Sequence, residues 1–373
     1  MDRGKKQSTL FTKKNKIYMD LKDIIRENAL PFLPAKSLHR CRGVCRDWKL
    51  TIYSPFFAHT QSNTFNVVSG FFCQLASGVP SFVSLDPMAY GVPDPSLNFL
   101  PEPVDIRASS NGLLCCQGRT GNKAYYICNP VTKQFKKLPQ PEADHGADPA
   151  LVLVFEPSLL NFIAQYKLVC AFPSELDGIE FEIYSSEKGS WRISGDICFG
   201  DAKLLPTSGV YVNGTVYWRA SHGIISLDLA TERSKILYRE LGTLGVISKR
   251  LCTAYLHASQ KLDVSLLSNT YSNTMQMNSQ AKTWIALKPN INPNLPATLA
   301  ARDAYYSGER YYYSAQRSEV GDGVVFVREN LVLMRIENTL YSYDLKKETT
   351  TATLGKVESR ARIFGYVNSL VEL

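Results

Sequence analysis

The apolar positions near the start of the chain follow the period of an α-helix. Leu21, Ile24, Ile25 and Ala29 stand at i, i+3, i+4 and i+8, which places them on one helix face. Pro31 disfavours helical backbone at the residue before it, so this helix is expected to end just before the proline.

Two more short helices are predicted before residue 58. Pro34 can occupy the first turn of the second helix, where its missing N–H costs nothing. The third helix places Val44, Trp48 and Ile52 at i, i+4 and i+8, and it is expected to end at the Ser-Pro pair of residues 54–55. Three helices in about 40 residues bury too small a core to be robust alone, so we expect this unit to dock on the rest of the chain.

From residue 64 onward the pattern changes to short β-branched and aromatic runs between Gly, Pro and Asn turns. One unit recurs six times: a strand ends on a polar residue, a tight turn follows and a second strand returns. The spacing between copies is 42, 56, 44, 50 and 66 residues. A blade of a β-propeller has four strands and a period of about 40–50 residues. The polar residues that anchor the copies are Asp86, Cys128, Tyr184, Asp228, Asn278 and Asp344.

These repeats predict an all-β propeller behind the helical unit. Six copies favour six blades, and the loose register leaves seven as the alternative. A β-sandwich followed by a separate barrel is the competing architecture. The Asn213-Gly214 pair is interpreted as a hairpin turn rather than as a glycosylation site.

The two ends of the β region are expected to meet. Residues 362–373, "RIFGYVNSLVEL", form a strand-like run without a repeat unit of their own, and the first unit lacks one strand. Pairing of this run with residues 65–72 would close the ring and remove exposed sheet edges.

Charge is concentrated at the N-terminus. The chain has 373 residues and a formal net charge of +8, and residues 1–60 hold 13 Lys/Arg against 5 Asp/Glu, which is the whole excess. A basic module can meet nucleic acid, an anionic membrane or an acidic protein. No aromatic residues interleave with the lysines, which argues against nucleic acid. We expect a disordered basic segment at 1–16, a helical domain at 17–60 and a β domain at 62–373.

Several function classes find no support in the sequence. No apolar run approaches 18 residues, so no membrane span is predicted, and the absence of a signal-peptide core favours an intracellular protein of the cytoplasm, the nucleus or both. The nine cysteines are scattered without a CxxC pair, and the five histidines are dispersed. Phosphate-loop, dinucleotide, HExxH and GxSxG motifs are absent. We therefore predict no enzyme, no catalytic residue, no metal and no cofactor.

Residues 33–57, "LPAKSLHRCRGVCRDWKLTIYSPFF", resemble the F-box of plant F-box proteins. The downstream segments "SSNGLLCC", "YYICNPVTKQFKKLP" and "VYVNGTVYW" are similar to the kelch-like, F-box-associated region of the same proteins. The resemblance implies a small three-helix F-box followed by a propeller. The matching F-box positions are Leu33, Pro34, Lys36, Ser37, Leu38, Arg40, Val44, Cys45, Trp48, Ile52, Ser54, Pro55 and Phe57.

This resemblance implies a substrate receptor of a Skp–cullin–F-box ubiquitin ligase. The F-box would dock on a Skp-type adaptor, and through it on a cullin, while the propeller holds a target protein whose identity and binding residues the sequence leaves open. The chain would act by proximity rather than by its own chemistry. The residues implied for adaptor binding are Leu33, Pro34, Leu38, Val44, Cys45, Trp48 and Ile52.

Other interpretations remain beside it. Trp48 and Val44 could belong only to the internal core of the helical unit, and the nearby Arg40, Arg42 and Arg46 could form a solvated face rather than meet an acidic adaptor. The runner-up function is a glycan- or ligand-binding propeller without a ligase role.

Overall fold

A computed structural model describes most of the chain. The predicted disordered segment 1–16 and the fifth repeat anchor, Asn278, lie outside the described residues. No helix within the described part is long and apolar enough to cross a membrane. The described residues are 21–157, 164–200, 203–221, 223–237, 242–257, 259–268, 284–295 and 323–373.

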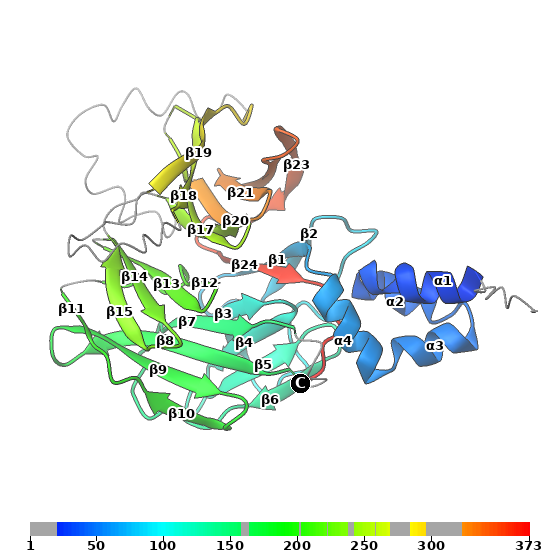
Figure 1. Cartoon of the computed structure of the whole chain (residues 1–373), viewed down its shortest axis with the longest axis horizontal. Coiled ribbons are helices and arrows are strands. Elements are labelled where there is room, and N and C mark those ends of the chain that lie inside the picture. The colour runs from blue at the N-terminus through cyan, green and yellow to red at the C-terminus, as the bar shows by residue number, and fades with distance from the viewer. Residues whose placement is uncertain are drawn as a thin grey trace, which may run out of the picture.

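The described N-terminal region holds four α-helices and a 3₁₀ helix, where the sequence predicted three helices. The first three α-helices project from the β domain, and the fourth lies against it (Figure 1). The elements are α1 (Leu21–Asn28), the 3₁₀ helix η1 (Leu30–Phe32), α2 (Ala35–Cys41), α3 (Arg46–Ile52) and α4 (Pro55–Thr64).

The third helix ends at Ile52, just before the Ser-Pro pair, as predicted, but a fourth helix that the sequence did not predict begins at that pair. Ser54 has extended backbone, and its Oγ accepts a hydrogen bond from the N–H of Phe57 at 3.2 Å. Pro55 follows at the first helical position, where no N–H is needed. The Ser-Pro pair therefore starts a helix, and α4 runs through the boundary predicted between residues 60 and 62.

The third helix starts later than predicted. Cys45 is its N-cap, with extended backbone and a Sγ atom that accepts a hydrogen bond from the N–H of Trp48 at 3.4 Å. Val44 therefore precedes the helix. The spacing had predicted that Val44 and Ile52 share a helix face, and this prediction is wrong. Likewise Pro34 is the N-cap of α2 rather than a residue of its first turn.

The helical unit has its own apolar core, and one member comes from the opposite end of the chain. Leu370 packs against residues from η1, α2, α3 and α4. The predicted docking of this unit therefore involves the C-terminus. The buried members of the core are Leu30, Ala35, Leu38, Ile52, Phe57, Ala58 and Leu370.

Two antiparallel meanders cover residues 104–199 of the β domain. The first contains β3 (Val104–Ser110), β4 (Leu113–Gly118), β5 (Tyr125–Asn129) and β6 (Gln134–Lys137). The second contains β7 (Ala150–Phe155), β8 (Tyr166–Ser174), β9 (Gly178–Ser185) and β10 (Ser190–Ile193), with β11 (Cys198–Phe199) paired to β9.

Three further four-stranded meanders follow. The first of these contains β12 (Val210–Val212), β13 (Thr215–Ala220), β14 (Gly223–Asp228) and β15 (Arg233–Leu237). The next contains β16 (Thr243–Ile247), β17 (Arg250–Leu256), β18 (Leu262–Leu267) and β19 (Trp284–Ile291). The last contains β20 (Gly323–Arg328), β21 (Leu331–Ile336), β22 (Thr339–Asp344) and β23 (Thr349–Lys356), and it joins its predecessor through the parallel bridge Val246–Arg328.

The remaining sheet joins the two ends of the β domain. Its strands are β2 (Ser81–Ser84), β1 (Val68–Gln74) and β24 (Arg362–Val367). The predicted pairing is confirmed, because β24 is antiparallel to β1 with Phe364 opposite Phe72. The rings of Phe72 and Tyr366 meet edge to face at 5.3 Å between centroids.

The sheets follow one another around a ring. Their innermost strands contact one another in the order β24, β3, β7, β12, β16 and β20, and β20 contacts β24 in turn. The arrangement is propeller-like (Figure 1) and differs from the sandwich-plus-barrel alternative.

Four of the predicted strand–turn–strand copies are confirmed as the hairpins β5–β6, β9–β10, β14–β15 and β22–β23. The first copy is wrong: β2 pairs only with β1, and no strand follows before Val104. Prolines at 87, 93 and 95 remove backbone donors there, which opposes a returning strand.

The Asn-Gly turns link neighbouring sheets. Asn213 and Gly214 have φ of 45° and 85°, which confirms the predicted hairpin turn, and Nδ2 of Asn213 donates to the Lys249 carbonyl at 2.7 Å. Asn111 repeats the arrangement, donating from Nδ2 to the Phe155 carbonyl at 2.7 Å. Each turn therefore ties its sheet to the next one around the ring.

Candidate adaptor-binding surface

The helical unit exposes an unusual amount of apolar surface for its size. Seven large apolar side chains on it are between 41% and 67% exposed. Single exposed apolar residues are ordinary, but a group of them on a small unit indicates a surface for a partner. The seven are Leu21, Ile24, Phe32, Val44, Leu50, Tyr53 and Phe56.

The seven residues implied by the sequence do not form one surface. Leu38 and Ile52 are buried in the helical core, and Pro34 is also buried. Leu33, Cys45 and Trp48 are half-buried, and only Val44 is exposed. Contact of all seven with an adaptor stays a prediction.

The exposed residues Leu50, Tyr53 and Phe56 were missed at the sequence level. Tyr53 and Phe56 flank the start of α4, a helix that the pattern did not predict. Leu50 lies off the apolar face that the Trp48–Ile52 spacing defines. Their exposure depends on how the helices pack together. It could have been predicted only if the fourth helix had been recognised in the sequence.

The basic side chains on the helical unit divide into two groups. Arg46 and Lys49 are exposed on α3, the helix that also carries the exposed Leu50. The guanidinium of Arg42 lies 4.2 Å from the ring centroid of Tyr53, a cation–π contact. Arg40 instead turns toward the β domain and donates from Nη1 to the Met88 carbonyl at 3.2 Å.

Gln61 on α4 forms the first part of a buried joint between the helical unit and the ring. Its Nε2 donates to the carbonyls of Leu33 at 3.1 Å and Asn368 at 3.2 Å. Its Oε1 accepts the N–H of Leu370 at 2.9 Å. The amide therefore binds the C-terminal segment much as a neighbouring strand would.

Asn368 forms the second part of the joint. Its Oδ1 accepts the N–H of Lys36 at 3.1 Å, and its Nδ2 donates to the Gly91 carbonyl at 2.7 Å. Its backbone N–H donates to Ser69 Oγ at 3.0 Å. One fully buried side chain thus touches α2 and the loop after β2, so the helical unit has a defined position on the ring.

Asn129 holds the rest of the segment on the ring. Its Nδ2 donates to the carbonyls of Ser369 at 3.1 Å and Val371 at 2.8 Å. Figure 1 marks the C-terminus close to α4 and β6, between the two parts of the molecule. The C-terminal segment is therefore the common partner of both.

Replacing Gln61 with Leu is expected to loosen this joint. The substitution keeps the volume but leaves two carbonyls and one N–H without partners, at about 1–3 kcal/mol for each buried group. Hydrogen exchange should speed up in residues 366–373 and in α2. Asn63→Ala, an exposed change on the same helix, is the matched control. Equal exchange in both variants would contradict a coupling role for Gln61.

No group of three or more His, Cys, Asp or Glu side chains among the described residues is placed to hold a metal ion. The nine cysteines are free thiols, and most are buried. Together, a ring with a helical unit fixed on it and an apolar surface on that unit define a two-part binding protein.

The comparisons with known proteins identify this class. The sequence profile of the F-box associated beta propeller domain matches residues 94–373. The chain is 30% identical to F-box protein At5g07610 of Arabidopsis thaliana, over 89% of this chain and 85% of that protein. The chain therefore belongs to the plant F-box proteins with an F-box-associated β-propeller. Members of this family generally serve as substrate receptors of Skp–cullin–F-box ligases. They are typically non-catalytic.

Two other relatives from Arabidopsis thaliana agree. F-box protein At5g49610 is 37% identical over 53% of this chain and 58% of its own length. The putative F-box/kelch-repeat protein At3g17570 is 25% identical over 72% of each chain. The resemblance noted at residues 33–57 is thus extended by relatives that share the rest of the chain.

Proposed function

We propose that this chain is the substrate-recognition subunit of a Skp–cullin–F-box ubiquitin ligase. Its helical unit binds a Skp-type adaptor, and its ring, with six blades, holds a target protein for ubiquitination. The observation that carries the proposal is the exposed apolar surface on the helical unit, together with family membership. The exposed Arg46 and Lys49 on α3 favour an acidic partner.

The buried joint supports the second half of the proposal. A receptor acts by raising the effective concentration of target lysines near the activated ubiquitin. Hydrogen bonds from Gln61, Asn129 and Asn368 hold the helical unit on the ring, so a target on the ring would keep a defined orientation relative to the adaptor.

Changing the exposed apolar surface to acidic residues is expected to abolish adaptor capture. Val44→Asp combined with Leu50→Asp replaces two side chains that are 64% and 61% exposed, so folding should be unaffected. Losing two interface anchors typically costs about 2 kcal/mol or more each. The affinity of the full chain for a Skp-type adaptor, measured by biolayer interferometry, should fall at least a hundredfold.

Val79→Asp is the matched control, because Val79 is 70% exposed on the ring. It should capture the adaptor as the unchanged protein does. Undiminished capture by the double variant would overturn the assignment of the surface. Failure of the unchanged protein to capture any Skp-type adaptor would favour a ligand-binding propeller without a ligase role.

A further inference from the structure

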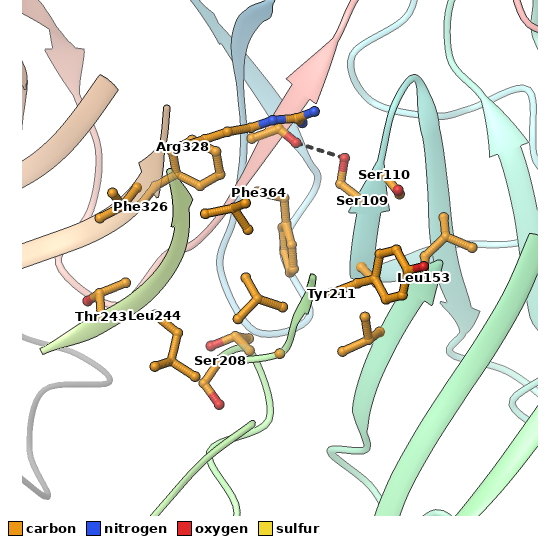
Figure 2. Close-up of a pocket in the computed structure, with 18 of the residues that line it drawn as sticks. Ser109, Ser110, Leu153, Ser208, Tyr211, Thr243, Leu244, Phe326, Arg328 and Phe364 are labelled. Atoms are coloured by element: carbon orange, nitrogen blue, oxygen red, sulfur yellow. Dashed lines mark hydrogen bonds between the residues drawn. The ribbon is translucent and has the colours of Figure 1, made fainter. Parts of the chain in front are cut away.

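A cavity of about 480 Å³ lies at the axis of the ring, where all the innermost strands meet (Figure 2). Its volume is in the range of small-molecule sites, about 300–1,000 Å³. Apolar and aromatic side chains form much of its wall. Those that Figure 2 labels are Leu153, Tyr211, Leu244, Phe326 and Phe364.

Arg328, at the end of β20, places a guanidinium at this cavity. Figure 2 shows the side chain extending toward Ser109 and Ser110 on β3. Its Nη2 donates to Oδ1 of Asn111, a neutral acceptor, at 2.8 Å. Among the described residues, no carboxylate forms an ion pair with it. Burial lowers the pKa of Arg328, while the charge of Glu329 raises it.

Arg107, Arg362 and Glu329, which also line the cavity, have described partners. Arg107 and Arg362 share the carboxylate of Asp148, with Arg362 Nη2 at 2.6 Å from Oδ2. Glu329 accepts the N–H of Ser248 at 3.0 Å through Oε2. Arg328 differs from these arginines because its described partner is uncharged.

Three more polar groups line the same cavity. The Glu156 carboxylate accepts a hydrogen bond from the Tyr211 hydroxyl. Burial raises the pKa of Tyr211, and the charge of Glu156 raises it further. Lys249 is exposed and adds positive charge. The hydroxyl of Ser109 already donates to the Gly365 carbonyl at 2.7 Å. The charge available to a ligand at this cavity is therefore positive.

A half-buried cation without an ion-pair partner is costly, and an anion that binds there offsets the cost. The apolar wall favours a ligand whose remaining atoms are apolar. We infer that the axial cavity binds a carboxylate attached to an apolar body, with the carboxylate on the Arg328 guanidinium. A small organic acid or an acidic group of a target peptide could supply this chemistry. The site is separate from the adaptor-binding surface and goes beyond the proposed ligase role.

Two pairs of probes test the inference on the full chain by calorimetry. The first pair is 3-phenylpropionate and its neutral amide. The second is a pentapeptide, acetyl-Gly-Phe-Glu-Phe-Gly-amide, and its Gln counterpart. We expect at least one acid to bind ten times more tightly than its neutral partner. Binding of only the small acid assigns the site to organic acids, and binding of only the peptide assigns it to targets.

Arg328→Gln should reduce the affinity of the preferred acid at least tenfold and leave that of its neutral partner unchanged. If this variant fails to fold, Asn111→Asp is the second test, because it places a carboxylate against the guanidinium and should have the same effect. Arg192→Gln, an exposed change at the Arg192–Glu232 pair outside the cavity, is the control.

The inference is overturned if neither acid is preferred, or if Arg328→Gln keeps the preference. The guanidinium would then only tie β20 to the Asn111 turn. Adaptor capture by Arg328→Gln should stay unchanged, so failure here and failure of the proposed function give different results.

Discussion

Deletion of residues 362–373 is expected to unfold the β domain. The deletion removes β24, leaves the edge of β1 unpaired and exposes the apolar faces of its neighbours. Phe364, Tyr366, Val367 and Leu370 are buried, at roughly 1.5–3 kcal/mol each. Their sum is comparable to the ~5–15 kcal/mol that stabilises a typical domain. The truncated protein should aggregate, or melt far below the intact one, in a thermal scan with size-exclusion chromatography.

Tyr366→Ala is the graded version of this test. It removes one fully buried aromatic side chain and should lower the free energy of unfolding by about 3–5 kcal/mol while leaving the strand in place. A monomeric truncated protein with an unchanged melting temperature would show that β24 does not close the ring.

Glu182→Ala is expected to destabilise the sheet of β7 to β10 strongly. The Glu182 side chain is fully buried on β9. Its carboxylate accepts the N–H groups of Glu142 at 2.7 Å and Ala143 at 3.2 Å, and it lies 2.7 Å from His145 Nε2. Tyr125 completes the chain, with its hydroxyl 3.0 Å from His145 Nδ1.

Removing this carboxylate leaves the buried His145 ring and the N–H groups of Glu142 and Ala143 without their acceptor, so urea denaturation should show a loss of about 3–5 kcal/mol. Glu180→Ala on the same strand is the control, because Glu180 is half-buried and its carboxylate accepts a hydrogen bond from the Ser174 hydroxyl rather than from a buried network. It should cost less than about 1 kcal/mol. Equal losses in the two variants would contradict a special role for Glu182.

The same carboxylate gives the protein a pH dependence. Burial alone would raise the pKa of Glu182, but hydrogen bonds from His145, Glu142 and Ala143 outweigh it and lower the pKa below its ordinary value. A lowered folded-state pKa stabilises the protein above the unfolded-state pKa, and this stability is lost as the pH falls through the folded-state pKa. The urea concentration at the unfolding midpoint should therefore decrease as the pH is lowered below about 4.3, the ordinary pKa of a Glu carboxyl. It should fall less steeply in Glu182→Ala.

The repeated β pattern could be predicted because each copy carries its own local signal. Strand alternation and turn residues such as Asn213 and Asp228 are set within a few positions of one another. The pairing of β1 with β24 was also predictable, because a strand without a unit at one end matches a missing strand at the other. The first repeat failed because the prolines after Asp86 outweigh its turn signal.

The helical unit was harder to predict in detail. A Ser-Pro pair has two opposite meanings, since the same residues can end one helix or cap the next. At Ser54 both meanings apply: α3 ends at Ile52, and Ser54 caps α4, whose Phe57 and Ala58 bury against the core. A domain boundary at residue 62 would divide α4 just after Gln61, which the structure shows is half of the joint.

The joint and the cavity had no sequence signal. Gln61, Asn129 and Asn368 are isolated amides far apart in the chain, and only the closed ring brings them together. The sequence predicted that the helical unit carries the apolar surface, but not which of its residues face outward. Leu38, predicted to bind the adaptor, is buried, whereas Leu50 is exposed.

The order of synthesis gives the β1–β24 pair a further consequence. Ser69 and Asn368 are hydrogen-bonded although 299 positions separate them. At about 5–20 residues per second, a ribosome needs roughly 15–60 s to cover that interval. During this time Phe71 and Phe72 stand on an unpaired strand edge, and α4 lacks Leu370. The nascent protein therefore exposes an unpaired strand edge and apolar surface, the features that make folding intermediates prone to aggregate, for that interval. Premature termination anywhere upstream of β24 yields a chain that neither closes its ring nor completes its helical unit.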